Sequence, residues 1–123
     1  VIATRQLQDL IQHGQGPVLV DVAAGEGHAT LEGSVWIPGA GRGSNFIDAV
    51  QGQFAELLSR LTQGDKARPL VFFCVNSQCW LSYNAALRAV AAGFTQVYWY
   101  RGGIEAWRAS GLGLVRMELT EAR

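Results

Sequence analysis

Short apolar runs alternate along the chain with segments of helical spacing. The runs "PVLVDV" (17–22), "PLVFFC" (69–74) and "TQVYWY" (95–100) have strand length and are rich in β-branched or aromatic residues. A fourth run, "VWIPG" (35–39), predicts a very short strand that Pro38 ends, because proline has no amide hydrogen for a ladder. We therefore predict four strands, of which 69–74 has the strongest signal.

Helical spacing of apolar residues predicts the elements between these strands. Leu7, Leu10 and Ile11 share one face of the first helix, and Thr4 is suited to its N-cap. Glycines are suited to end two of the helices. The predicted helices are 4–14, which ends at Gly14, 45–61, 80–92, which Gly93 follows, and a short one after a glycine turn within 101–111.

Strands separated by helices in a chain of 123 residues indicate parallel crossovers, and therefore a twisted sheet with helices on both faces. The fold class we expect is α/β, a three-layer sandwich with a central parallel sheet. The length favours a single domain over residues 1–123. Glycines at 25, 27 and 33 predict a loop, and the pattern leaves 112–123 unassigned.

The composition excludes several classes of function. Ten basic residues match ten acidic ones, the pI is near 6.9, and no run of Lys or Arg predicts a nucleic-acid surface. The longest apolar run, Leu70–Val75, is far shorter than the ~18 residues of a membrane span. Two cysteines and the distant His13 and His28 make a poor zinc set, so we expect no metal and no other cofactor.

Chemically useful residues stand where the predicted strands end. Ligands of open parallel sheets bind beyond the carboxyl ends of the strands. Those ends carry Asp21, the Pro38-Gly39 loop, Cys74 and Arg101. Cys74 follows the strongest strand, and it is therefore the candidate catalytic residue.

The loop after Cys74 joins a strand to a helix N-terminus, where the first amides have no partner within the helix. Such amides form a cradle for an anion, and they stabilise a thiolate at its rim, so a thiol with an ordinary pKa of ~8.5 ionises near neutrality. The alternative is a buried structural cysteine in an apolar strand. The predicted cradle comprises Val75, Asn76, Ser77, Gln78, Cys79 and Trp80.

Both cysteines of the chain flank this one loop. They reach disulfide distance, with Cα atoms under ~7 Å apart, if the loop curls as a cradle does. Cys79 is thus a candidate resolving thiol for whatever forms on Cys74. The plainer interpretation is that Cys79 packs at the start of an amphipathic helix.

Four motifs in order resemble the rhodanese (sulfurtransferase) superfamily, and the resemblance spans nearly the whole chain as a single rhodanese-like domain. They are "PVLVDV", "IPGA" at 37–40, the cysteine loop with "NAALRAVAAGFTQVYWY", and "RGGIEAW" at 101–107. More narrowly, "GSVWIPGAG", "QCWLSYNAALRA" and "VYWYRGG" are similar to a bacterial rhodanese-like group with a Cys-Trp pair. That group is associated with pyrroloquinoline-quinone-dependent alcohol catabolism and periplasmic export. Both the bacterial periplasm and the cytoplasm stay open, and the resemblance favours the periplasm.

The resemblance implies sulfur transfer. The thiolate of Cys74 takes a sulfane sulfur from a thiosulfate- or persulfide-like donor and becomes a persulfide. A thiol or another nucleophile, either a small molecule or a carrier protein, then removes that sulfur. The loop amides hold the charged outer sulfur of the intermediate.

This loop departs from common rhodanese loops, which carry an arginine where the chain reads Val-Asn-Ser-Gln-Cys-Trp. Arg42 and Arg101 from neighbouring loops are candidate substitutes for binding an anionic donor, and each is equally interpreted as a solvated charge. Related dual-specificity phosphatases need an arginine six positions after the nucleophile. That position is Trp80 here, which argues against phosphoryl transfer.

Two further functions stay open from the sequence. One is a thiol–disulfide switch in which Cys74 and Cys79 cycle between dithiol and disulfide. The other is a non-catalytic interaction module, a role that many rhodanese-like domains have.

Overall fold

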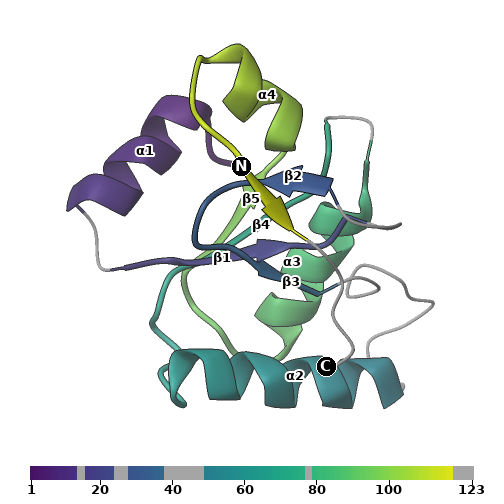
Figure 1. Cartoon of the computed structure of the whole chain (residues 1–123). Helices are drawn as coiled ribbons and strands as arrows, with labels where there is room; N and C mark the ends of the chain where they lie inside the picture. Colours follow the sequence, from purple (N-terminus) through teal and green to yellow (C-terminus); the bar gives the residue numbers. More distant parts are fainter. Residues whose placement is uncertain (14–15, 24–27, 38–48, 77–78, 118–123) are drawn as a thin grey trace.

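The computed structural model describes residues 1–13, 16–23, 28–37, 49–76 and 79–117 (Figure 1). The elements alternate between strands and helices for most of this length. In chain order they are α1 (Thr4–His13), β1 (Val18–Asp21), β2 (His28–Thr30), β3 (Val35–Trp36), α2 (Ala49–Thr62), β4 (Leu70–Phe73), α3 (Leu81–Ala91), β5 (Val97–Tyr100), α4 (Gly103–Ala109) and β6 (Val115–Met117).

A parallel sheet with the strand order β3-β1-β4-β5 forms the centre of the fold. Every residue of β1 and β4 is buried. Continuously apolar strands of this kind belong to parallel sheets that are covered on both faces. The prediction of an α/β fold with a central parallel sheet is confirmed, and the strands lie where the four apolar runs predicted them.

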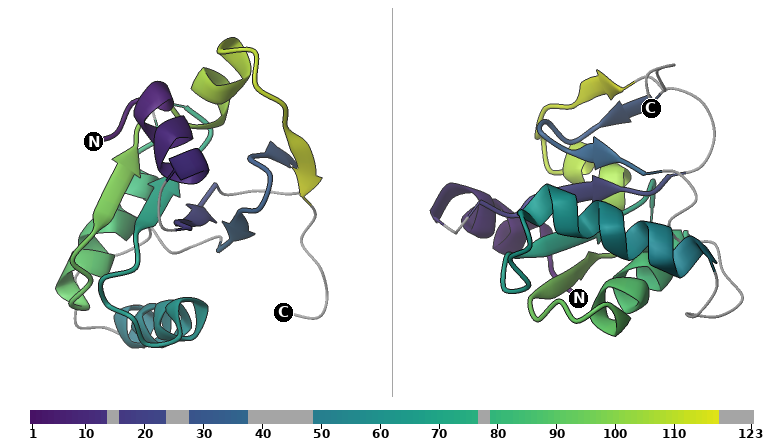
Figure 2. Two further views of the ribbon diagram at one scale, coloured as in Figure 1. Left: turned by 90° about the vertical axis from the view of Figure 1, so that its left-hand side faces the viewer. Right: turned by 90° about the horizontal axis from the view of Figure 1, so that it is seen from below.

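Helices cover both faces of this sheet. α2 and α3 pack on one face, where Phe54 and Ala85 join the cluster around Phe72. α1 and α4 pack on the other, where Leu7 and Ile104 join a second cluster. Figures 1 and 2 show α1 and α2 on opposite sides of the sheet. Alternate residues of each central strand feed the two clusters, as the pleat of a strand requires.

The beginning of α1 differs from the prediction. The first helical hydrogen bond runs from the Leu7 amide to the carbonyl of Ala3, and the Ala3 amide donates to Gln6 Oε1 at 2.8 Å, so Ala3 is the N-cap residue. Thr4 instead bonds the buried Tyr100 hydroxyl at 2.6 Å and ties α1 to β5. Burial raises the pKa of Tyr100, and this hydrogen bond acts in the opposite direction.

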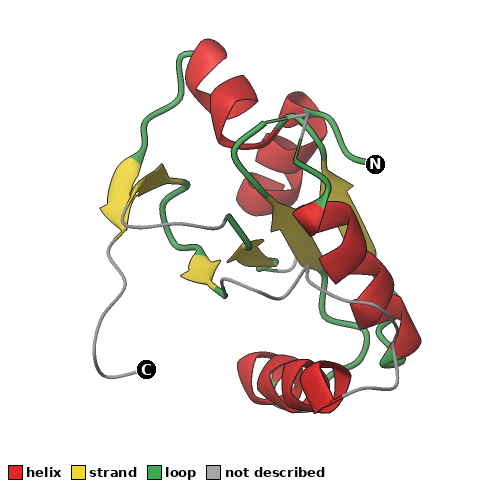
Figure 3. Ribbon diagram, turned by 90° about the vertical axis from the view of Figure 1, so that its right-hand side faces the viewer, coloured by secondary structure: helices red, strands yellow, loops and turns green. Residues whose placement is uncertain are grey.

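A second, two-stranded sheet was not predicted. β2 and β6 pair antiparallel, with Ala29 opposite Arg116, and Figure 3 shows them apart from the central strands. The prediction of a loop around glycines 25, 27 and 33 was therefore wrong for 28–30, and β6 lies in the tail that the pattern left unassigned. Gly14, glycines 25 and 27, and the predicted helical residues 45–48 lie outside the described residues.

Candidate functional site

The central strands end at one level, and this brings the candidate residues to one edge of the sheet. Asp21 of β1 pairs with Phe73 of β4, which in turn pairs with Tyr100 of β5. Cys74 and Arg101 therefore begin neighbouring loops at the carboxyl edge. Parallel α/β sheets bind their ligands at this edge.

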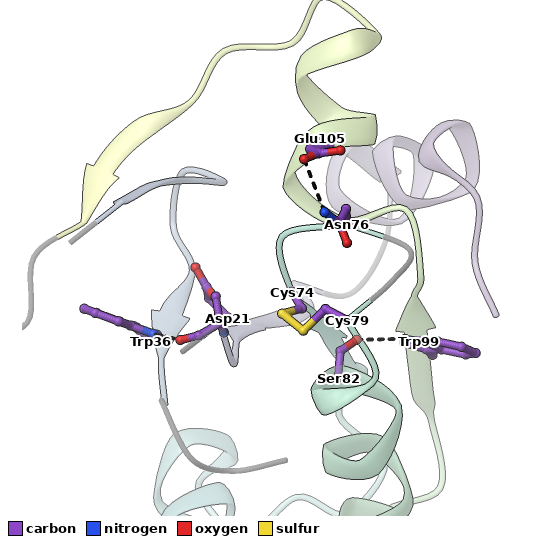
Figure 4. Close-up of a disulfide and its surroundings, with 9 residues drawn as sticks. Asp21, Trp36, Cys74, Asn76, Cys79, Ser82, Trp99 and Glu105 are labelled. Carbon is purple, nitrogen blue, oxygen red and sulfur yellow. Dashed lines mark hydrogen bonds between the residues drawn. A yellow bond between two sulfur atoms is a disulfide. The ribbon is translucent and has the colours of Figure 1, made fainter. Parts of the chain in front are cut away.

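A disulfide joins Cys74 to Cys79 at this edge, with Cα atoms 6.1 Å apart (Figure 4). The two residues differ in burial. Cys74 is 2% exposed and belongs to the apolar cluster under α2 and α3, whereas Cys79 is half-buried and packs against that cluster. A reagent in solution therefore has better access to Cys79 than to Cys74.

The start of α4 donates hydrogen bonds to two consecutive carbonyls at the beginning of the cysteine loop. The amide of Ile104 donates to the Cys74 carbonyl at 3.0 Å, and the amide of Glu105 donates to the Val75 carbonyl at 2.9 Å. The side chain of Asn76 donates to Glu105 Oε2 at 3.3 Å. The sequence pattern gave no sign of these contacts, apart from the glycine pair that precedes Ile104.

Gly103 makes this close approach between α4 and the cysteine loop feasible. Its φ is +65°, a conformation that glycine adopts without a Cβ penalty. A Cβ at this position would overlap the Cys74 carbonyl oxygen and lie 3.0 Å from the carbonyl carbon. The glycine is therefore required both for its backbone angle and for its lack of a side chain.

The structure describes part of the predicted amide cradle. The amide of Cys79 donates to the Asn76 carbonyl at 3.1 Å. Ser77 and Gln78 lie outside the described residues. The cradle as a binding site for a sulfur anion stays a prediction, and so does the role of Cys74 as its nucleophile.

Aromatic rings and one cation lie beside the cysteine loop. Trp80, one of the predicted cradle residues, is 52% exposed. Its ring packs against Trp99 at a tilt of 40°, with centroids 5.4 Å apart, and meets Tyr83 edge-on. The Arg101 guanidinium lies 5.5 Å from the Trp80 ring and 5.6 Å from the Trp99 ring, which is cation–π distance.

These contacts place Arg101 next to the loop, as its candidate role in donor binding requires, but that role stays a prediction. Arg42, the other candidate, lies outside the described residues.

Two elements next to the loop, α3 and the end of β1, carry buried hydrogen bonds, and Figure 4 shows Ser82, Trp99 and Asp21 around the disulfide. Trp99 Nε1 donates to Ser82 Oγ at 2.8 Å, which fixes the first turn of α3 after Cys79. On the other side, Asp21 is fully buried and accepts the Ala23 amide at 2.8 Å. We therefore interpret Asp21 as a structural residue at the end of β1.

A groove of about 540 Å³ lies elsewhere on the molecule, between α1, α4 and β6. Gln8, Glu32 and Trp107 are among its lining residues, and no described residue of the cysteine loop is. The described residues hold no cluster of three or more His, Cys, Asp or Glu side chains arranged for a metal ion. Within the same residues, no helix has the length and hydropathy needed to traverse a bilayer.

One comparison with known proteins identifies a family. The model of the rhodanese-like domain matches residues 3–110. No curated protein gave a significant match.

Among solved structures, a full-length protein from Lactobacillus plantarum is 20% identical, with a TM-score of 0.66 over 94% of this chain and 87% of the other. The BH2092 protein from Bacillus halodurans is 24% identical, with a TM-score of 0.67 over 93% and 74%. A thiosulfate sulfurtransferase from Pseudomonas aeruginosa is 14% identical, with a TM-score of 0.63 over 98% of this chain and 22% of that one. On its domain match and its fold, the chain belongs to the rhodanese-like domain family.

Proposed function

We propose that the protein is a sulfurtransferase that carries sulfane sulfur on Cys74. The observation that supports this most is the position of Cys74, directly after the central strand β4 at the carboxyl edge of a rhodanese-like sheet. In the first half-reaction, the Cys74 thiolate attacks the outer sulfur of thiosulfate. A sulfur–sulfur bond forms on Cys74, and sulfite leaves with the electron pair of the bond that breaks.

In the second half-reaction, an acceptor thiolate attacks the outer sulfur of the Cys74 persulfide. The acceptor becomes a persulfide, and Cys74 is released as a thiolate. The acceptor is a small thiol or a thiol of a carrier protein. Because Cys74 is bonded to Cys79 in the structure, the form that accepts sulfur is the reduced protein.

The position of Arg101 favours an anionic sulfur donor as the substrate. It is an exposed cation beside Trp80, the residue that follows Cys79, and two aromatic rings hold its guanidinium in place. A guanidinium forms charge-assisted hydrogen bonds with sulfonate oxygens such as those of thiosulfate. Arg101 therefore supplies, from the β5–α4 turn, the charge that the cysteine loop itself lacks.

Intact mass spectrometry tests this function with a matched pair of variants. Each protein is reduced, freed of reductant without air and incubated with thiosulfate or a small alkyl persulfide. Cys79→Ser, which cannot form the disulfide, should gain one sulfur atom, and Cys74→Ser should gain none. If Cys79→Ser gains no sulfur from either donor, the proposed function is wrong.

The disulfide favours a second candidate function, thiol–disulfide exchange. Cys79 is the more exposed sulfur, so an incoming thiolate attacks it and releases the buried Cys74. Such a role needs an oxidising compartment, in keeping with the periplasm that the sequence resemblance favoured. Alkylation before and after reduction tests it, because freely labelled thiols in mildly oxidised protein would contradict it.

A further inference from the structure

The fold holds the two cysteine sulfurs within bonding distance of each other while the elements on both sides stay in place. Cys74 directly follows the central strand β4, and its carbonyl accepts a hydrogen bond from the amide of Ile104. Cys79 precedes α3, whose first turn is fixed by the bond between Ser82 and Trp99. The Cys79 amide also donates to the Asn76 carbonyl at 3.1 Å. A bond between the sulfurs is therefore compatible with the intact fold.

Burial favours Cys79 over any outside thiol as the group that attacks the Cys74 sulfur of a persulfide. An external acceptor has to reach a side chain that is 2% exposed. Cys79 already lies next to Cys74, with their Cα atoms 6.1 Å apart. Groups held in reacting geometry gain a large advantage over the same groups in solution, with effective molarities of about 10⁵ M or more.

We propose that Cys79 is a second catalytic thiol that releases the sulfur from Cys74 as hydrogen sulfide. This inference rests on the proposed function, because it requires a persulfide on Cys74. The sulfur of Cys79 attacks the Cys74 sulfur, a bond forms between the two cysteine sulfurs, and the bond to the outer sulfur breaks. The outer sulfur leaves with that electron pair and takes the thiol proton of Cys79.

The electrons balance within this step. The Cys79 sulfur is oxidised from thiol to disulfide, and the outer sulfur is reduced to sulfide. The product is the Cys74–Cys79 disulfide that the structure contains. An external dithiol then reduces this disulfide through the more exposed Cys79 and becomes a disulfide itself. The protein thus couples oxidation of a dithiol to reduction of sulfane sulfur.

A single-turnover experiment without any dithiol tests this step. Reduced wild type, Cys79→Ser and Cys74→Ser are each mixed without air with thiosulfate, or with a small alkyl persulfide if thiosulfate does not load Cys79→Ser. Released sulfide and intact mass are followed over time. A sample without donor controls for oxidation of the two protein cysteines by other routes.

We expect wild type to release one equivalent of sulfide and to end as the disulfide, two hydrogens lighter than the reduced protein. Cys79→Ser should keep the added sulfur and release sulfide at least about 100-fold more slowly. If wild type also keeps the added sulfur and releases no sulfide, the role of Cys79 is wrong while the proposed function stands. If Cys79→Ser takes up no sulfur from either donor, both are wrong.

Discussion

Replacement of Gly103 by alanine tests how the structure holds the cysteine loop. At φ +65° an alanine adopts the left-handed region, and its Cβ meets the carbonyl of Cys74 and lies 3.1 Å from the carbonyl carbon of Val75. These are backbone atoms, which cannot rotate away as a side chain can. The substitution therefore has to displace α4 from the loop, or the loop from the edge of the sheet.

Two costs add in Gly103→Ala. An L-residue in the left-handed region costs roughly 1–2 kcal/mol. Inserting a group into occupied space costs a further amount of about 1–3 kcal/mol. We therefore expect the free energy of unfolding to fall by about 2–5 kcal/mol.

Gly111→Ala is the matched control. Gly111 has a similar φ of +82°, but its Cβ would meet nothing within 4 Å, so it carries the backbone cost without the clash. Urea unfolding of both variants measures the difference, which we expect to be about 1–3 kcal/mol. Equal losses in the two variants would refute the contact between α4 and the carbonyl of Cys74.

Three further predictions concern the disulfide, the buried tyrosine and the exposed arginine. Reducing the bond between Cys74 and Cys79, which lie 5 positions apart, should lower the free energy of unfolding by about 2 kcal/mol, and urea unfolding with and without reductant measures it. Folding raises the pKa of Tyr100. The contribution of its protonated form to the free energy of unfolding is therefore complete below the unfolded pKa of about 10 and is lost as pH rises through the folded pKa. Wild type should therefore lose stability more steeply than Tyr100→Phe above about pH 10 in alkaline unfolding curves, and parallel curves would contradict this. Arg101→Gln should raise KM for thiosulfate about two- to fivefold in steady-state kinetics, with kcat little changed. The KM for a sulfur donor that carries no charge should be the same in this variant as in wild type.

The central sheet could be predicted from the sequence because its strands are continuous apolar runs. A continuous apolar run has to bury both faces, and it does so between two layers of helices. The local pattern and the global fold therefore agree. The pairing of β2 with β6 could not be predicted in this way. It joins Ala29 to Arg116, far apart along the chain, through segments of three residues whose local pattern is not that of a strand.

The sequence predicted the two cysteines of the candidate site, but not the contacts that hold the cysteine loop in place. The spacing of Cys74 and Cys79 around one turn allowed a disulfide, and the structure contains one. The hydrogen bonds from α4 to the cysteine loop depend on where a later crossover returns to the sheet, which no local pattern records. The exposure of Trp80 likewise depends on how α3 is oriented against β5.

Peptide mapping by mass spectrometry locates the sulfur atom that the proposed function places on Cys74. Cys79→Ser is reduced, treated with thiosulfate or a small alkyl persulfide, digested without reductant and compared with Cys74→Ser. We expect one added sulfur atom on the peptide that contains Cys74 and on no other peptide, and none anywhere in Cys74→Ser. Sulfur bound at any other residue, or the same uptake by both variants, would contradict it.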